Sequence, residues 1–521
     1  MAWPNPFYRR TPNTRECWGY TFELTDEHLT PEECEPLKHS YDVLGEQVLD
    51  RLNELSPPPK KDLPRGNSRF VDAKDVVGQE VHNDGVPKAE EDALEDKDKA
   101  DEKGTQNIKD ASDEKGTQKM KDAPRDLYVI LQDHLDNDEL LQRFWKEATT
   151  VPAWVDWEQI ARGQDVFYRY GAANLTGLAY QSLLGGMGAA RVVETLARTG
   201  GFSTKVARSR LFETTQHILQ CTKSVESIQP GGDGFASTIR VRLLHAAVRN
   251  RIFKLAESKP SYYDVQAWGI PINDLDSMGT ISTFSATLIW LSLPRQGIYL
   301  RQQEIADYVA LWRYIAHVIG CPTDRFATAA QAKRMMEALL LYEIRPTETS
   351  KIMANNIIKS LEHQPPGYAS ADFLTASARW LNGNDLCDEL GLMRPGIYYW
   401  TLMAGQCLFF SLFAYTYRFA PTSWGWDRRH IDMLKKAFYQ IIVHTKYGLK
   451  GEESRFEFKY VPEYETITEM GEGTGDQGEG KGGIERRNFR TFVLGVGGWG
   501  WGVGVGVWIG VGVVRRVWGL F

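Results

Sequence analysis

The spacing of apolar residues predicts helices along most of this chain. In residues 36–55, apolar side chains such as Leu44, Val48 and Leu52 recur every three or four positions, which is the period of an amphipathic helix. The same period returns between residues 124 and 450, where no convincing run alternates apolar and polar positions as strands do. The pattern therefore predicts an all-α fold whose core is large enough to enclose a ligand.

Helical spacing is clearest in five later segments of the chain. One of them, residues 191–202, contains a glycine pair that is expected to cap the helix at its C-terminal end. The five segments cover residues 125–149, 191–202, 209–227, 239–254 and 301–320. They predict one large helical domain and not a string of small ones.

A polar and highly charged stretch separates the first helical segment from the rest. Residues 56–123 contain "DEKGTQNIKDA" followed by "DEKGTQKMKDA", a repeat with a period of 12. Such a composition buries too little apolar area to offset the entropy of ordering, so a disordered insertion is predicted. The expected organisation is an N-terminal helical segment (1–55) that packs on a catalytic domain (124–450), followed by a low-complexity tail (451–521).

Two apolar runs raise the question of a membrane. Residues 395–417 carry no charge over a length that could span a bilayer, but the mixture of polar and aromatic residues favours a buried core helix. Residues 491–514 contain nine glycines in 24 positions, and glycine disfavours helix by about 1 kcal/mol each. An irregular or disordered tail is therefore favoured there, with a C-terminal membrane anchor as the second interpretation.

The net charge and the spacing of the cysteines argue against some kinds of partner and metal site. The net charge of −7 and the pI near 5.9 disfavour a nucleic-acid partner, since phosphate recognition needs a basic surface. The six cysteines show no zinc-type spacing, and the chain begins without the apolar core of a secretory signal. We therefore expect reduced thiols and an intracellular protein, with association to the endoplasmic reticulum or another membrane left open.

One histidine interrupts an apolar helix face. At helical spacing Val241, His245, Val248 and Ile252 share one side of the segment 239–254, so His245 stands where a leucine is expected. It is either a core histidine whose ring nitrogens are hydrogen-bonded within the protein, or a ligand of a bound group. Axial ligation of haem iron requires an imidazole that is surrounded by hydrocarbon, as this one is expected to be. The spacing alone does not decide between the two.

Other polar patterns are weaker signals. Glu194 and Arg198 stand four apart, which usually means a solvated ion pair, whereas Glu213 and His217 at the same spacing could share a metal. The stretch "LLGGMGAARVVETL" (183–196) lacks the third glycine and the preceding strand of a dinucleotide-binding loop. A nucleotide site is not predicted.

Six motifs in order resemble one enzyme family over roughly residues 125–340. The order and spacing are similar to those of the catalytic domain shared by bacterial rubber oxygenases (latex clearing proteins) and fungal MpaB-type oxygenases of mycophenolic acid biosynthesis. The residues of the first motif are most similar to those of fungal members. The motifs are "VPAWVDWEQIARGQDVFYRYG" (151–171), "ETLARTGGF" (194–202), "RLFETTQ" (210–216), "RVRLLHAAVR" (240–249), "WGIPINDLDSMGTISTFS" (268–285) and "IADYVALWRYIAHVIGCP" (305–322).

The resemblance implies a haem-oxygenase-type domain that binds haem b, uses O2 and cleaves or oxidises a C=C bond of a terpenoid, prenylated or other lipid-like substrate in secondary metabolism. Carried over by motif, His245 is the axial ligand of the haem iron, and Glu194 is a base near the distal pocket. Arg210 and Thr214 are the paired polar residues that support that pocket. The rubber enzymes have lysine directly before this threonine, where this chain has Glu213, so distal ligation by lysine is not implied.

Two other functions stay open at this stage. The first is a non-haem iron oxygenase that uses Glu194, Glu213 and His217. The second is a non-catalytic, membrane-associated binder of hydrophobic small molecules, which would use the same cavity without a metal.

Overall fold

Helix dominates the protein. The computed structural model describes residues 9–58, 125–456, 468–472 and 483–495. The described residues are 69% helical, and the described sheet is a single pair of strands, which confirms the predicted all-α class. Most of the predicted insertion, including its repeat, and most of the predicted tail lie outside the described residues.

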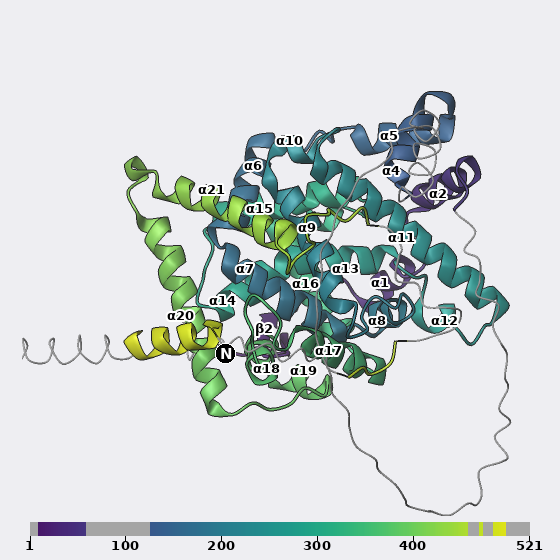
Figure 1. Ribbon diagram of the computed structural model, residues 1–521. Helices are drawn as coiled ribbons and strands as arrows, with labels where there is room; N and C mark the ends of the chain where they lie inside the picture. Colours follow the sequence, from purple (N-terminus) through teal and green to yellow (C-terminus); the bar gives the residue numbers. More distant parts are fainter. Residues whose placement is uncertain (1–8, 59–124, 457–467, 473–482, 496–521) are drawn as a thin grey trace, which may run out of the picture. The chain divides into compact units, whose positions relative to one another are not determined.

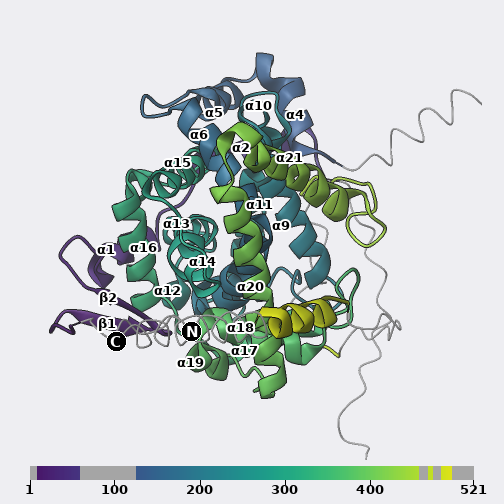
Figure 2. The ribbon, with the colours of Figure 1, turned by 90° about the vertical axis from the view of Figure 1, so that its left-hand side faces the viewer.

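The described helices are shown in Figures 1 and 2, and short 3-10 or π-helical segments carry the label η. A further helix spans residues 483–495. The bounds are α1 (Pro31–Leu37), α2 (Val43–Leu55), α4 (Leu127–His134), η1 (Leu135–Asn137), α5 (Glu139–Thr149), α6 (Trp157–Arg169), α7 (Gly171–Gly177), η2 (Leu178–Leu184), η3 (Gly185–Gly188), α8 (Ala190–Ala197), α9 (Ala207–Lys223), α10 (Val225–Ile228), α11 (Asp233–Ser258), α12 (Val265–Trp268), α13 (Asp274–Phe284), η4 (Leu288–Ser292), α14 (Leu293–Arg295), α15 (Gln302–Val318), η5 (Asp324–Phe326), α16 (Ala329–Tyr342), α17 (Glu348–Leu361), α18 (Ala371–Asn382), α19 (Asn384–Glu389), α20 (Ile397–Phe419), η6 (Thr422–Trp424), α21 (Trp426–Tyr439) and η7 (Gln440–His444).

Two predicted helix ends are shifted in the structure. The single helix expected over residues 36–55 is divided, and α2 starts only at Val43 because the Asp42 carboxylate accepts a hydrogen bond from the Gly45 N–H, as an N-cap does. The helix predicted over residues 191–202 also ends before the glycine pair that was expected to cap it. Helix α8 ends at Ala197, and Gly200 lies beyond it in a turn with φ of 67°.

Helix α11 is buried even on faces that carry charged arginines. Arg242 and Arg249 lie outside the apolar stripe of the segment 239–254, yet each is only 2% exposed. The guanidinium of Arg242 meets both carboxylate oxygens of Asp42 at 2.7 Å, and that of Arg249 donates to backbone carbonyls of the loop before α13. The N-terminal segment therefore packs on α11 through buried ion pairs as well as apolar contacts.

Helix α20 is apolar but only half enclosed. It is long and apolar enough to cross a bilayer by length and composition, and 39% of its most apolar window is buried inside the protein. Ile397 and Phe419 remain 80% and 71% exposed, whereas Gly405 comes so close to the 483–495 helix that an added Cβ would lie 2.0 Å from the Asn488 carbonyl oxygen. Figures 1 and 2 both show these two helices side by side. The core-helix prediction is thus correct for one face.

A short hairpin near the N-terminus was not predicted. Strands β1 (Thr14–Cys17) and β2 (Tyr20–Glu23) pair antiparallel, and Cys17 faces Tyr20 in the register. The two turn residues, Trp18 and Gly19, both have positive φ, which matches the right-handed twist of tight hairpins. Four-residue strands are too short to give a readable alternation.

Candidate functional site

A cavity of about 440 Å³ lies inside the helical domain. Helices α8, α9, α11 and α13 contribute much of its wall. The wall is mostly hydrocarbon, with contributions from Leu178, Met187, Leu244, Phe284, Trp312 and Ile315 among others. Such a space suits an apolar ligand, which a small number of polar groups would orient.

His245 lies on this wall. Three residues of the predicted stripe, Val241, His245 and Val248, line the cavity together with Leu244. Among the described residues none forms a hydrogen bond or ion pair with the His245 ring. Burial, with smaller effects from Arg249, His217 and Arg210, lowers the pKa of His245 to about 4. The imidazole is therefore neutral at pH 7 and keeps a nitrogen lone pair for a ligand.

A second histidine on the same wall already has partners. The Nδ1 of His217, on α9, lies 2.9 Å from the Ser237 hydroxyl, and burial lowers the pKa of His217 to about 4. One turn earlier, Glu213 pairs with Arg210 at 3.0 Å. No group of three or more metal-type ligands converges within the described ranges. The geometry therefore gives no support to a non-haem iron site of Glu194, Glu213 and His217.

The arginine and threonine of the α9 motif do reach the cavity. Arg210 and Thr214 line it together with His245. The Thr214 hydroxyl has no hydrogen-bond partner among the described residues, whereas the neighbouring Thr215 hydroxyl donates to the Leu211 carbonyl at 2.7 Å. A hydroxyl that faces a cavity without a protein partner is available to a ligand.

Glu194 lies behind the wall. Its carboxylate accepts from Arg198 at 2.7 Å, and Glu194 is 9% exposed, so the predicted ion pair forms but is buried and not solvated. Its neighbour Thr195 lines the cavity and Glu194 does not. The carboxylate of the α9 motif that does line the cavity is Glu213. The predicted role of Glu194 as a base stays a prediction.

One polar cluster on the wall was missed. Arg191 contacts Asp276 at 2.7 Å and Glu343 at 2.6 Å, and all three residues line the cavity. Burial raises the pKa of Asp276, and Arg191 opposes that rise. The three residues come from α8, α13 and the end of α16, so no local spacing could have joined them.

The family of this domain follows from comparison with family models. Residues 168–411 match the model described as "ER-bound oxygenase mpaB/B'/Rubber oxygenase, catalytic domain". This part of the chain is therefore similar to the catalytic domain of this oxygenase family. The predicted resemblance is confirmed, and Arg210, Thr214 and His245 all fall within the matched residues of the oxygenase domain.

One solved structure is similar to part of this chain. It is described as "Structure of Latex Clearing Protein LCP in the closed state", with 18% identity, a TM-score of 0.44, and coverage of 57% of this chain and 79% of that chain. No curated protein matches the chain.

The two cavity histidines predict a pH dependence of stability. An unfolded histidine has a pKa near 6.5, whereas both are held near 4 in the fold, so between these values the unfolded state binds the proton first. The free energy of unfolding should therefore fall as the pH drops from about 6.5 to 5, by roughly 1–2 kcal/mol per histidine. Urea titrations at several pH values measure it.

The control variant is His363→Gln, since His363 is 46% exposed and should leave the pH curve unchanged. His217→Gln should flatten the curve by removing one of the two contributions. Identical unfolding midpoints at pH 7 and pH 5 in the wild type would contradict a neutral histidine pair.

Proposed function

We propose that this protein is a haem-b-dependent oxygenase that uses O2 to cleave or oxidise a C=C bond in a terpenoid, prenylated or other lipid-like substrate. The observation that carries the proposal is the neutral His245 imidazole, without a partner among the described residues, on the wall of an apolar cavity inside an oxygenase catalytic domain. The hydrocarbon wall fits both a porphyrin and an isoprenoid chain.

The residues present fit the cofactor. His245 would hold the haem iron through a ring nitrogen, and Val241, Leu244 and Val248 would add apolar surface to the same wall. When bound, haem would supply the iron chemistry that activates O2. The protein supplies the dry surroundings, because apolar side chains cover most of the wall.

The α9 residues provide the polar chemistry. We assign the Thr214 hydroxyl and the Arg210 guanidinium as donors that orient the polar atoms of the bound oxidant or substrate. Glu213, held by Arg210 at 3.0 Å, is the carboxylate of the α9 motif in the cavity wall, and we assign it to accept or return a proton. Glu194 acts from behind the wall as a positioning residue by fixing Arg198.

Haem reconstitution tests the proposed function. The purified full-length protein should develop a Soret band after addition of haem and removal of the excess. Protein that shows no Soret band would contradict the proposal. If such protein still bound a prenylated ligand, the non-catalytic binder would become the better interpretation.

Thr214→Val should slow turnover of an isoprenoid alkene by about tenfold or more while haem binding is retained. The exchange keeps the shape of the side chain and removes only the hydroxyl, and one lost donor in a dry site costs at least this factor. Thr215→Val is the matched control, because that hydroxyl bonds its own helix. Equal rates in the two variants would remove Thr214 from the mechanism.

Membrane association also stays a proposal. It is supported by the words "ER-bound" in the family description and by the exposed apolar face of α20. Flotation of the protein with liposomes tests it, and protein that stays in the dense fraction would contradict it.

A further inference from the structure

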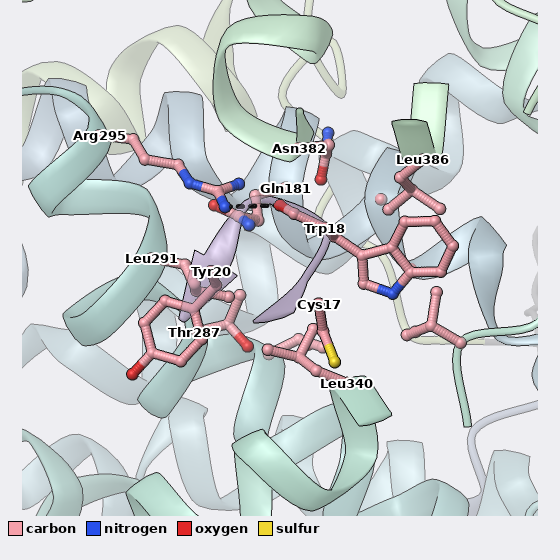
Figure 3. Close-up of a pocket in the computed structure, with 14 residues that line it drawn as sticks. Cys17, Trp18, Tyr20, Gln181, Thr287, Leu291, Arg295, Leu340, Asn382 and Leu386 are labelled. Carbon is pink, nitrogen blue, oxygen red and sulfur yellow. Dashed lines mark hydrogen bonds between the residues drawn. The ribbon is translucent and has the colours of Figure 1, made fainter. Parts of the chain in front are cut away.

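A small pocket of about 60 Å³ adjoins the large cavity (Figure 3). Five residues line both spaces and so form the wall between them: Gly186, Thr283, Thr287, Leu340 and Ile344. The opposite side is made by the β1–β2 hairpin, through Trp18 and Tyr20. One buried water needs roughly 10–15 Å³ of such space, so the pocket has the size of a small polar group and not of a chain.

Among the described residues, the guanidinium of Arg295 in this pocket has no acidic partner. Arg295 is 7% exposed, and its described hydrogen bonds go to the backbone carbonyls of Leu381 and, at 2.8 Å, Trp18. Burial lowers the pKa of Arg295 to about 10, and Cys387 and Tyr20 oppose this decrease only in part.

The other deeply buried arginines of the described chain differ in this respect. Each forms an ion pair with a carboxylate: Arg198 with Glu194, Arg242 with Asp42, Arg249 with Glu46, and Arg379 with Asp388. A buried cation without an acid is costly unless a ligand brings the negative charge.

The amide of Gln181 points to the same conclusion. Gln181 is 7% exposed and lines the small pocket, and its side-chain oxygen is buried without a hydrogen-bond partner. Figure 3 shows this amide projecting toward the Arg295 guanidinium. The NH2 group of the same amide forms no hydrogen bond with a described residue, so it can donate to a carboxylate oxygen that is also bound by Arg295.

We propose that this pocket is a carboxylate site, which holds the acid group of a ligand whose apolar part lies in the adjoining cavity. The inference deepens the proposed function, because it makes the ligand of this oxygenase an amphiphilic acid. Two carboxylates could occupy the site: the acid terminus of an isoprenoid-like substrate, or a propionate side chain of the haem.

The test uses Gln181→Glu in the full-length protein. The exchange is nearly isosteric and gives Arg295 a permanent anion, so it leaves the hairpin contacts of Arg295 in place. Farnesoic acid and farnesol, which share one C15 chain, serve as probes in calorimetric titrations. Wild-type protein should bind the acid, and the variant should lose at least tenfold in affinity for it, while farnesol binding changes less than twofold.

Two further variants keep the result interpretable. Gln142→Glu adds the same charge at an exposed position of α5 and should change neither affinity. Gln181→Met removes the amide without adding charge and should weaken acid binding by a smaller, several-fold factor, which guards against a folding defect of the glutamate variant.

Haem retention separates the two sources of the carboxylate. If the site holds a propionate, Gln181→Glu should retain haem poorly but bind haem dimethyl ester as the wild type does, with unchanged farnesoic acid binding. Equal binding of both haem and farnesoic acid by wild type and variant would overturn the site. A protein that takes up no haem but shows the predicted acid discrimination would refute the proposed haem function and leave the carboxylate site standing.

Discussion

His245→Ala should abolish the Soret band of the haem-reconstituted protein. The ring is the histidine of the cavity wall that lacks a partner among the described residues, and its low pKa keeps it neutral and able to bind iron at pH 7. Removing it takes away the protein ligand of the iron, so we expect the cofactor to be lost on gel filtration. Absorbance of the protein peak at the Soret wavelength, relative to 280 nm, measures the retained haem.

His217→Ala is the matched control for this experiment. His217 lines the same cavity and is equally neutral, but its ring already bonds Ser237. The His217 variant should keep most of its haem, and free imidazole should restore a Soret band to the His245 variant by filling the gap. Haem retained by the His245 variant and lost by the His217 variant would move the axial ligand to α9.

Asp42→Ala should lower the free energy of unfolding by about 3 kcal/mol. The substitution removes the fork of two 2.7 Å contacts from Arg242, which is only 2% exposed, and leaves a buried guanidinium with Glu147 as its remaining acidic partner. It also removes the hydrogen bond that starts α2 at Gly45. Urea denaturation followed by circular dichroism gives the change.

Asp50→Ala is the matched control for Asp42→Ala. Asp50 also connects α2 to α11, through an exposed 3.0 Å hydrogen bond from Asn250, and should cost less than about 0.5 kcal/mol. Equal effects of the two substitutions would mean that burial of the Asp42–Arg242 pair contributes nothing. Because Arg242 stands three residues before His245 on α11, the Asp42 variant should also bind haem less firmly.

The helices were predictable where the spacing of their apolar residues can be read within one continuous stretch of sequence. The spacing of the segment 301–320 predicted α15, and that of 239–254 predicted the middle of α11. The ends of helices were less predictable, as the late start of α2 after Asp42 shows. The β1–β2 hairpin was missed because four-residue strands carry too few positions for a period.

The site was predictable only in part. His245, Arg210 and Thr214 were named from one helix stripe and from motif order, and the structure brings them to one cavity. Glu194 was named by the same motifs but lies behind the wall, paired with Arg198. Helical spacing gives the direction of a side chain relative to its own helix, and not which neighbouring helix covers it.

The sequence by itself determined the helical class, the resemblance to the oxygenase family and the histidine on the apolar stripe, because each depends on motifs whose residues lie close together along the chain. Only the tertiary structure decided that Glu213 and not Glu194 lines the cavity, that Arg191, Asp276 and Glu343 meet, and that Arg295 is buried without an acidic partner among the described residues. These facts depend on residues far apart in the sequence, such as Arg191 and Asp276, which are 85 positions apart, and their burial is set by how the helices pack.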